Sequence, residues 1–322
     1  MALDHYVSQV HLKQFYSPAL NGKQMYGTKK QTLETFPCMS KNICRISEGN
    51  TNEYLQEPRI IEEVLKQIEP NYDVAIRNCR EGELIADTVF TVAGFAANVM
   101  TCAPASMRIN SDWLAKTVES TAVMMDRAGH IPPPPKELGG GSITELIEKG
   151  IIRVDVDGKY PQALGVTTII DRAFLFGNAD WDILINEDLD SPFFTSDFPV
   201  AIEPSEDPRI LNRLMPLAPD LAVRIRTKLE RLPLEKAVHF PNFSFRRYRP
   251  KRKEVESINR RIVQCAEEQV YYRDAHPWIL PFIKKHADFW IEPTTARLPA
   301  MSGEMVWSSM RIARRPKEVP QT

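Results

Sequence analysis

The sequence predicts an α+β fold that is mostly helical, with a small central sheet of mixed or antiparallel strands. Three patterns support this prediction. Apolar residues recur at helical spacing through most of residues 58–125, and short runs rich in strand-forming residues follow between 181 and 225. An amphipathic helical pattern then returns over residues 254–270.

The composition is that of an ordinary globular protein. Hydrophobic residues make up 43% of the 322 residues and charged residues 26%, a balance that excludes a disordered or fibrous chain. Lys and Arg number 41 against 42 for Asp and Glu, so the whole molecule has no field that attracts nucleic acid or an anionic membrane. Such a partner would need a local patch of charge.

The cysteines and the N-terminus indicate the compartment. Five scattered cysteines without Cys-x-x-Cys spacing fit neither a disulfide framework nor a zinc site, so we expect a reducing environment. The N-terminus lacks the basic and apolar stretches of a secretory signal. Polar residues interrupt the apolar stretch 84–102, which indicates a buried helix rather than a membrane span. We expect a cytoplasmic protein with no membrane association.

The first elements are a hairpin and three helices. Residues 5–16 are apolar and aromatic, and an Asn21-Gly22 turn separates them from residues 24–28, as in a β-hairpin. Helices are predicted over residues 58–79, 84–103 and 111–125. The first should be kinked at Pro70, and the second should end at Pro104.

The middle of the chain contains a Pro/Gly-rich excursion, residues 130–142. Ser142 and Glu145 after it have the spacing of a capping box, which predicts a short helix ending near residue 150. Residues 154–158 predict a strand and turn, and residues 163–176 a helix.

The second half is predicted to hold the strands. They are expected at 181–186, 193–195, 200–203, 211–217 and 221–225. Residues 254–270 should form the main C-terminal helix, because their apolar residues recur at helical spacing and acidic residues occupy the first turn. We expect one domain over residues 1–314, followed by a disordered tail, 315–322.

Motifs of four common enzyme classes are missing from the sequence. It contains no phosphate-binding G-x-x-x-x-G-K-[ST], no G-x-G-x-x-G after a strand, no H-E-x-x-H and no G-x-S-x-G. Because these motifs are missing, the sequence assigns no cofactor and no metal-ligating residues. It also leaves the oligomeric state open.

The first candidate site residues lie at the start of the chain. His5 could serve as a general base or a ligand, and the neighbouring Tyr6 could contact a substrate. The structural alternative is that both side chains are partly buried and donate hydrogen bonds across a strand.

The second candidate is the polar turn of residues 195–199, which lies between two apolar stretches at a strand end, where sites are often built. Ser196 and Asp197 are its candidate catalytic residues. The alternative is an Asx-type turn in which both side chains bond to backbone amides and Pro199 keeps Phe198 extended.

The third candidate is a basic run, residues 246–253, with six positive charges in eight residues and aromatic residues nearby. Such a mixture can hold phosphates and stack bases. The substrate-binding candidates in it are Arg246, Arg247, Arg249, Lys251 and Arg252. A solvated loop before a helix explains the same residues.

Asn259 is the fourth candidate. It lies on the edge of the apolar stripe of the C-terminal helix, where a buried amide must be hydrogen-bonded. It could position a substrate, or it could anchor a loop.

Two segments resemble the signatures of the bacterial domain-of-unknown-function family 4238. The N-terminal signature is the run from His5 to Phe15, and the central signature is the run Phe194-Thr195-Ser196-Asp197-Phe198-Pro199-Val200. The order of the pieces between and after them is also similar. Ser8 departs from the proline of the family pattern, and Cys102 stands where an arginine is expected. The resemblance implies one domain and supports His5, Asp197 and Asn259 as site residues, but it implies no reaction.

Two functions follow as hypotheses. The first is a hydrolase, a nuclease or nucleotide-directed enzyme, acting in bacterial defence or as a toxin. In it His5 and Asp197 act as acid and base, Ser196 and Asn259 position the substrate, and the basic run binds nucleic acid or another phosphate-bearing ligand. The second is a non-catalytic binding or regulatory protein in which the same polar residues are structural.

Overall fold

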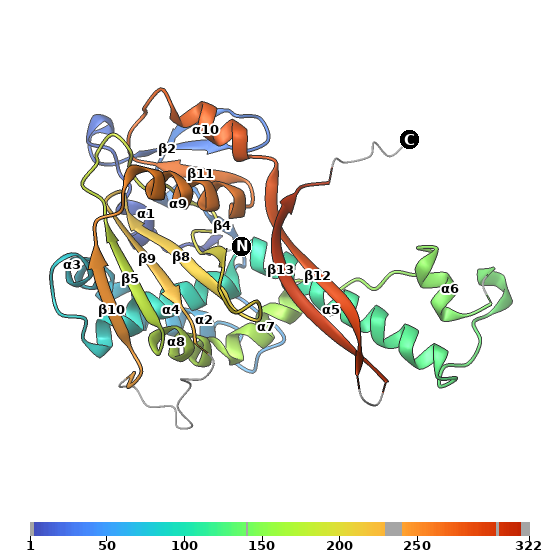
Figure 1. Ribbon diagram of the computed structural model, residues 1–322. Coiled ribbons are helices and arrows are strands. Elements are labelled where there is room, and N and C mark those ends of the chain that lie inside the picture. Colours follow the sequence, from blue (N-terminus) through green and yellow to red (C-terminus); the bar gives the residue numbers. More distant parts are fainter. Residues whose placement is uncertain (1–2, 140, 229–239, 301–302, 317–322) are drawn as a thin grey trace.

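The computed structural model describes residues 3–139, 141–228, 240–300 and 303–316 (Figure 1). It has an α+β fold in which helices hold 41% of the residues and strands 24%. The strands form four sheets, so the prediction of one small central sheet is wrong. Beside the main sheet, N-terminal strands take part in two further sheets, and the last two strands of the chain form the fourth.

The largest sheet has five strands in the order β10-β5-β9-β8-β7. Their bounds are β5 Asp180–Ile185, β7 Ala201–Pro204, β8 Leu211–Ala218, β9 Leu221–Arg226 and β10 Ser244–Tyr248. β10 pairs in parallel with β5, whereas the other neighbours are antiparallel. Four of the five predicted strands correspond to β5, β7, β8 and β9. The fifth, predicted at 193–195, overlaps a strand of another sheet, β6 Thr195–Ser196, at Thr195 alone. β10, which contains the start of the basic run, was not predicted.

A second sheet has the order β3-β2-β11-β6. Its strands are β2 Met25–Lys29, β3 Thr35–Cys38, β6 Thr195–Ser196 and β11 Gln269–Tyr272. β11 lies between β2 and β6, and it is antiparallel to both. The central signature is therefore joined to strands from the two ends of the chain.

The predicted N-terminal hairpin is wrong. Residues 5–16 do not form one strand: β1 Leu3–His5 pairs with β4 Arg45–Ser47, and the helix α1 Gln9–Lys13 follows. His11, Leu12 and Phe15 are all fully buried, and their spacing places them on one side of a helical turn. Short 3-10 turns follow at Pro18–Leu20 and Ser40–Asn42.

The helices of the first half were largely predicted. α2 Ile60–Ile68 and α3 Tyr72–Arg80 are separated by a 3-10 turn at Pro70, and α4 Ala86–Cys102 ends before Pro104. α5 Pro104–Arg127 begins seven residues earlier than expected, since Pro104 is favourable at the first helical position. In the described part of the chain no single helix is both long and apolar enough to cross a membrane, although α4 and α5, bent by 60°, meet that test as a pair.

The middle segment contains the 3-10 turn Lys136–Leu138 and the helices α6 Ile143–Glu148, α7 Lys159–Thr167 and α8 Ile169–Gly177. The Ser142 hydroxyl accepts the Glu145 amide at 3.1 Å, as the capping box predicts. The strand predicted at 154–156 is wrong. Asp157 accepts the Lys159 amide at 3.0 Å, so the Asp157-Gly158 pair begins α7 instead of closing a hairpin.

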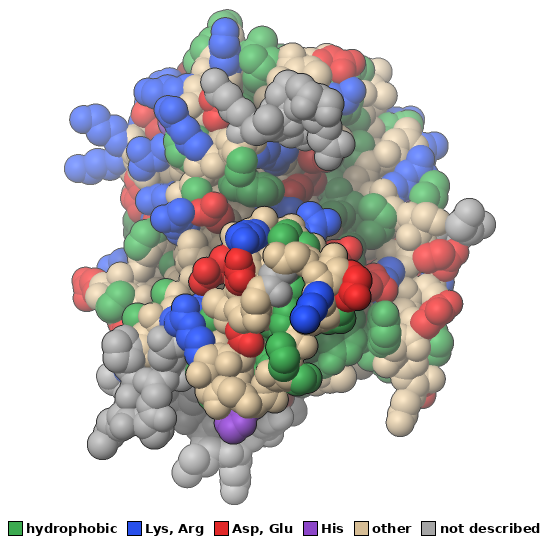
Figure 2. Space-filling view, turned by 90° about the vertical axis from the view of Figure 1, so that its right-hand side faces the viewer, with side chains coloured by type: hydrophobic (Ala, Val, Ile, Leu, Met, Phe, Trp, Pro, Cys, Tyr) green, Lys and Arg blue, Asp and Glu red, His purple; other side chains and the backbone are tan. Residues whose placement is uncertain are grey.

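The C-terminal part holds α9 Arg252–Cys265, α10 Ile279–His286 and the long hairpin β12 Phe289–Ala300 with β13 Gly303–Arg314. α9 is shorter than predicted, because Val270 lies in β11. The hairpin, which was not predicted, runs along α5 away from the main sheet (Figure 1). Hydrophobic side chains are exposed among charged ones on the face seen in Figure 2. Residues 317–322 of the predicted tail lie outside the described residues.

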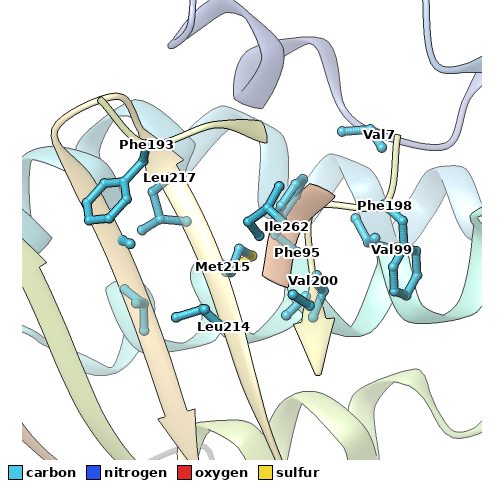
Figure 3. Close-up of a cluster of buried hydrophobic side chains, with 14 of the residues drawn as sticks. Val7, Phe95, Val99, Phe193, Phe198, Val200, Leu214, Met215, Leu217 and Ile262 are labelled. Carbon is cyan, nitrogen blue, oxygen red and sulfur yellow. The ribbon is translucent and has the colours of Figure 1, made fainter. Parts of the chain in front are cut away.

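One large core connects the main sheet to the helices. Its buried side chains extend along the chain from Val7 to Ile291. Figure 3 shows Phe198 of the central signature beside Val99 of α4, and Val200 near Phe95 of α4 and Ile262 of α9. The apolar residues of the signature thus fix the position of its polar turn.

Candidate functional site

The central signature borders a cavity of about 390 Å³. Its wall comes from segments that are far apart in the sequence. They are Tyr6 after β1, residues 42–46 around the start of β4, Pro104 and Ala105 at the start of α5, Asp197, and residues 267–269 at the start of β11. Two of the predicted site residues, Tyr6 and Asp197, therefore meet at one cavity.

Asp197 is 5% exposed, and its carboxylate accepts hydrogen bonds from backbone amides. Oδ1 accepts the Glu267 amide at 2.9 Å, and Oδ2 accepts the amides of Glu268 at 2.7 Å and Gln269 at 2.9 Å. The Asp197 amide in turn donates to the Gln269 carbonyl at 3.1 Å. This side chain fixes the turn between α9 and β11.

Burial raises the pKa of Asp197 to about 6, although the three amides and the positive charge of Lys30 oppose that rise. Lys30 is itself buried, and its ammonium donates to the carbonyls of Ala266 and, at 2.7 Å, Phe289. Burial lowers the pKa of Lys30 to about 8. A buried carboxylate and a buried ammonium thus both bond to the backbone of the same turn, residues 266–269.

A phenol and a thiol line the interior of this cavity. The Cys44 thiol donates to the Tyr271 hydroxyl at 3.6 Å, and burial raises the pKa of Cys44. Burial also raises the pKa of Tyr6 and that of Tyr271. These groups are neutral at physiological pH, so Cys44 is not a thiolate nucleophile. All five cysteines are buried and unpaired.

The rim of the cavity carries charges. Glu267 forms two hydrogen bonds with Arg108 of α5, at 2.7 and 3.0 Å. Arg45 and Glu268 also line the cavity. The charged lining residues are therefore Arg45 and the acidic Asp197, Glu267 and Glu268.

His5 lies in a different place. Its Nε2–H donates to the Ser40 carbonyl at 3.1 Å, and burial lowers the pKa of the ring. It lines a second cavity of about 390 Å³ together with Asp4, Glu62 and Glu69. His5 and Asp197 border different cavities, and the described residues show no contact between them.

Ser196 and Asn259 both bond to the backbone of the central segment. The Ser196 hydroxyl accepts the Phe198 amide at 3.1 Å. Asn259, which is fully buried, accepts the Phe194 amide at 2.9 Å and donates to the Pro192 carbonyl at 2.8 Å. Neither side chain borders the cavity at Asp197.

His11 is a contact residue that sequence reasoning did not select. Its Nδ1 lies 2.8 Å from the Tyr72 hydroxyl and its Nε2 lies 2.8 Å from the Thr195 hydroxyl. The ring stacks on Phe95 and is fully buried, which lowers its pKa to about 3. Its only sequence signal was its place within the N-terminal signature.

The arginine side chains of the basic run bond to other groups of the protein. Arg246 bonds to Asp182 at 2.6 Å, Arg249 to Glu187 at 2.7 Å, and Arg252 lies 3.5 Å from Glu256. Arg247 donates to backbone carbonyls, including that of Cys79 at 2.9 Å. Lys251 makes no ion pair with any described residue.

The described residues contain no group of three or more His, Cys, Asp or Glu side chains that could hold a metal ion.

Residues 4–276 match the model of a family described as a protein of unknown function, DUF4238. No curated protein matches the chain, and no solved structure does.

Proposed function

The chain belongs to the DUF4238 family, whose description gives no activity, and we propose from the geometry of its residues that it is a non-catalytic binding or regulatory protein. In this proposal the two signatures hold the fold together. The observation that carries it is the Asp197 carboxylate, which accepts three consecutive backbone amides, those of Glu267, Glu268 and Gln269.

A general acid or base must reach the proton that it transfers, directly or through one water. Three amides surround the Asp197 carboxylate, and its side chain is 5% exposed. Hydrogen bonds of this kind, from amides to an ionised group, are among the stronger ones in proteins. The arrangement therefore favours a structural role for Asp197.

The other selected residues support the same role. His5, Ser196 and Asn259 each direct a polar side-chain atom to a backbone group. A catalytic set would be expected to converge on one cavity. Of the candidate residues, Asp197 and Tyr6 line one of the described cavities and His5 lines another.

The basic run supports phosphate binding only weakly. Arg246, Arg249 and Arg252 have carboxylate neighbours, which a phosphate would have to displace. For this reason we place nucleic acid second among the partners.

Substitution of Asp197 by asparagine tests the proposal. The structural role predicts a loss of about 2–4 kcal/mol in the free energy of unfolding, because an amide group cannot accept all three N–H donors. Glu268→Gln is the matched control, since Glu268 lines the same cavity and its carboxylate makes no hydrogen bond with described residues. Unchanged stability of Asp197→Asn would contradict the proposal.

A hydrolase remains the second candidate because of one observation. Asp197, with its pKa raised to about 6, shares a cavity with the phenol of Tyr6, and such a carboxyl can exchange protons near neutral pH. If the chain is a toxic or defensive hydrolase that uses this pair, its expression arrests growth, and Tyr6→Phe, which removes the phenol hydroxyl, relieves the arrest while the protein stays folded. Arrest that persists in this folded variant counts against a catalytic role of Tyr6.

A further inference from the structure

A third cavity, of about 290 Å³, lies between α5, α7, α8 and β13. It shares no lining residue with the two larger cavities. Its walls are mostly apolar and include Trp113, Leu114, Pro161 and Leu164. Concave sites with apolar walls and a few polar groups are the usual form of small-molecule sites.

The charged group in this wall is Arg172 of α8. Its Nη1 donates to the Thr101 hydroxyl at 2.7 Å and to the Met100 carbonyl at 3.4 Å. Arg172 forms no ion pair with any described residue, and the remaining N–H groups of the guanidinium have no acceptor there. Burial lowers the pKa of Arg172. A guanidinium that has lost much of its water without gaining a carboxylate is an unusual and costly arrangement.

A second buried arginine adds to the positive potential. Arg213 of β8 is 9% exposed, and its Nε and Nη1 atoms have no hydrogen-bond partner. Its pKa falls to about 10 because it is buried and because the charge of Arg172 lies near it. Neither arginine has a carboxylate partner among the described residues. Two desolvated positive charges therefore act on one region of the core.

The polar atoms of this wall include donors that lack acceptors. The indole N–H of Trp113 is buried and makes no hydrogen bond with described residues. In Arg172, Nη1 is the one guanidinium nitrogen for which described residues supply acceptors. A ligand that satisfies these groups must bring acceptors and negative charge. A ligand that fits the walls must also bring apolar surface.

We propose that this cavity binds a small organic anion, a carboxylate that carries an apolar body. Arg172 receives the carboxylate, and Trp113, Leu114, Pro161 and Leu164 surround the apolar part. A free inorganic anion would leave the apolar walls uncovered, and a neutral apolar molecule would leave Arg172 without a partner. The inference names a ligand for the proposed binding role and gives it a site away from the signatures.

The test compares carboxylates with their neutral amides on the full chain. Phenylacetate and hexanoate are titrated beside phenylacetamide and hexanamide, with binding measured by calorimetry and by ligand-observed NMR. Because the carboxylate gains charge-assisted hydrogen bonds, each acid should bind about tenfold tighter than its amide, or better. Trp113→Phe should remove most of any change in tryptophan fluorescence on binding.

Two matched variants locate the site. Leu164 is 46% exposed and lines the cavity, whereas Ile170 on the next helix is 48% exposed and lines none of these cavities. Leu164→Trp should weaken carboxylate binding about tenfold or more by filling the cavity, and Ile170→Trp should leave binding unchanged. Arg172→Met should abolish the tighter binding of the acid over its amide. Arg172→Lys keeps the positive charge and should restore part of that preference, which a loss of folding in Arg172→Met would not explain.

The proposal is overturned if neither carboxylate binds with a dissociation constant below about 10 mM, or if acids and amides bind equally. It is also overturned if Leu164→Trp and Ile170→Trp have the same effect. These outcomes are independent of the stability of Asp197→Asn, so failure of the ligand site and failure of the structural role of the signatures are distinguishable.

Discussion

The Nε2 atom of His11 lies 2.8 Å from the Oγ1 atom of Thr195, and this contact joins the N-terminal signature to the central one. The same ring lies 2.8 Å from the Tyr72 hydroxyl through Nδ1. A neutral imidazole has one donor and one acceptor nitrogen, and either hydroxyl can take the complementary role. The two signatures thus meet in the core, through His11 and Thr195, whereas His5 and Asp197 border separate cavities.

The neutral state of His11 predicts a loss of stability in acid. Its pKa is about 3 in the fold and about 6.5 in an unfolded chain, so between these values only the unfolded state binds the proton. This contribution to stability is present above pH 6.5 and falls as pH drops, by about 2 kcal/mol at pH 5.

Asp197 contributes with the opposite sign. Its raised pKa of about 6 means that stability from this group falls as pH rises from about 4 to about 6. We therefore expect the difference between the wild type and His11→Leu, measured by chemical unfolding at pH 7 and pH 5, to isolate His11. The wild type should lose about 2 kcal/mol more than the variant over this range. Parallel pH profiles would show that His11 is protonated without cost in the fold.

Asn259 should be intolerant of substitution. Both ends of its side chain bond to the backbone around residues 192–194, and it is fully buried. Asn259→Ala should lower the free energy of unfolding by about 2–4 kcal/mol, since it leaves a buried amide and a buried carbonyl without partners. Asn71→Ala is the control, because the Asn71 side chain is exposed and its one hydrogen bond, at 3.4 Å, is weak. Similar small losses for both variants would contradict the anchoring role.

The ion pairs of the basic run predict weak binding of polynucleotides. A fluorescently labelled single strand of 20 nucleotides should show a dissociation constant no tighter than about 100 µM at 150 mM salt, the weak end of non-specific binding. Fluorescence anisotropy measures this. Micromolar or tighter binding that Lys251→Ala and Arg249→Gln reduce would instead favour the nucleic-acid hypothesis.

Helices were predictable from the sequence where apolar spacing and a proline acted together. The segments around α2, α3 and α4 follow this rule, and Pro70 and Pro104 mark their breaks as expected. The strands β5 and β9 were also predictable, because β-branched and aromatic residues occur at several of their positions. The strands β7 and β8 were predicted from short runs that contain apolar residues. Local patterns decide these elements.

Other elements depend on long-range contacts. Residues 9–13 form a helix because His11 and Leu12 are drawn into a core made by distant segments, and β11 forms by pairing with β2 and β6. The hairpin of β12 and β13 lies along α5, which no local pattern reveals. The cavity at Asp197 combines segments near residues 6, 45, 104 and 268, so the sequence could identify Asp197 and Tyr6 but not their neighbours Cys44 and Arg45.

A double-mutant cycle on His11 and Thr195 tests the central claim, that the signatures are structural partners, most directly. His11→Leu, Thr195→Val and the double variant are compared with the wild type by chemical unfolding. We expect a coupling free energy of about 1–2 kcal/mol, because removal of either group leaves the facing atom of the other, Nε2 of His11 or Oγ1 of Thr195, buried without this partner. Additive effects, with a coupling free energy near zero, would contradict the claim.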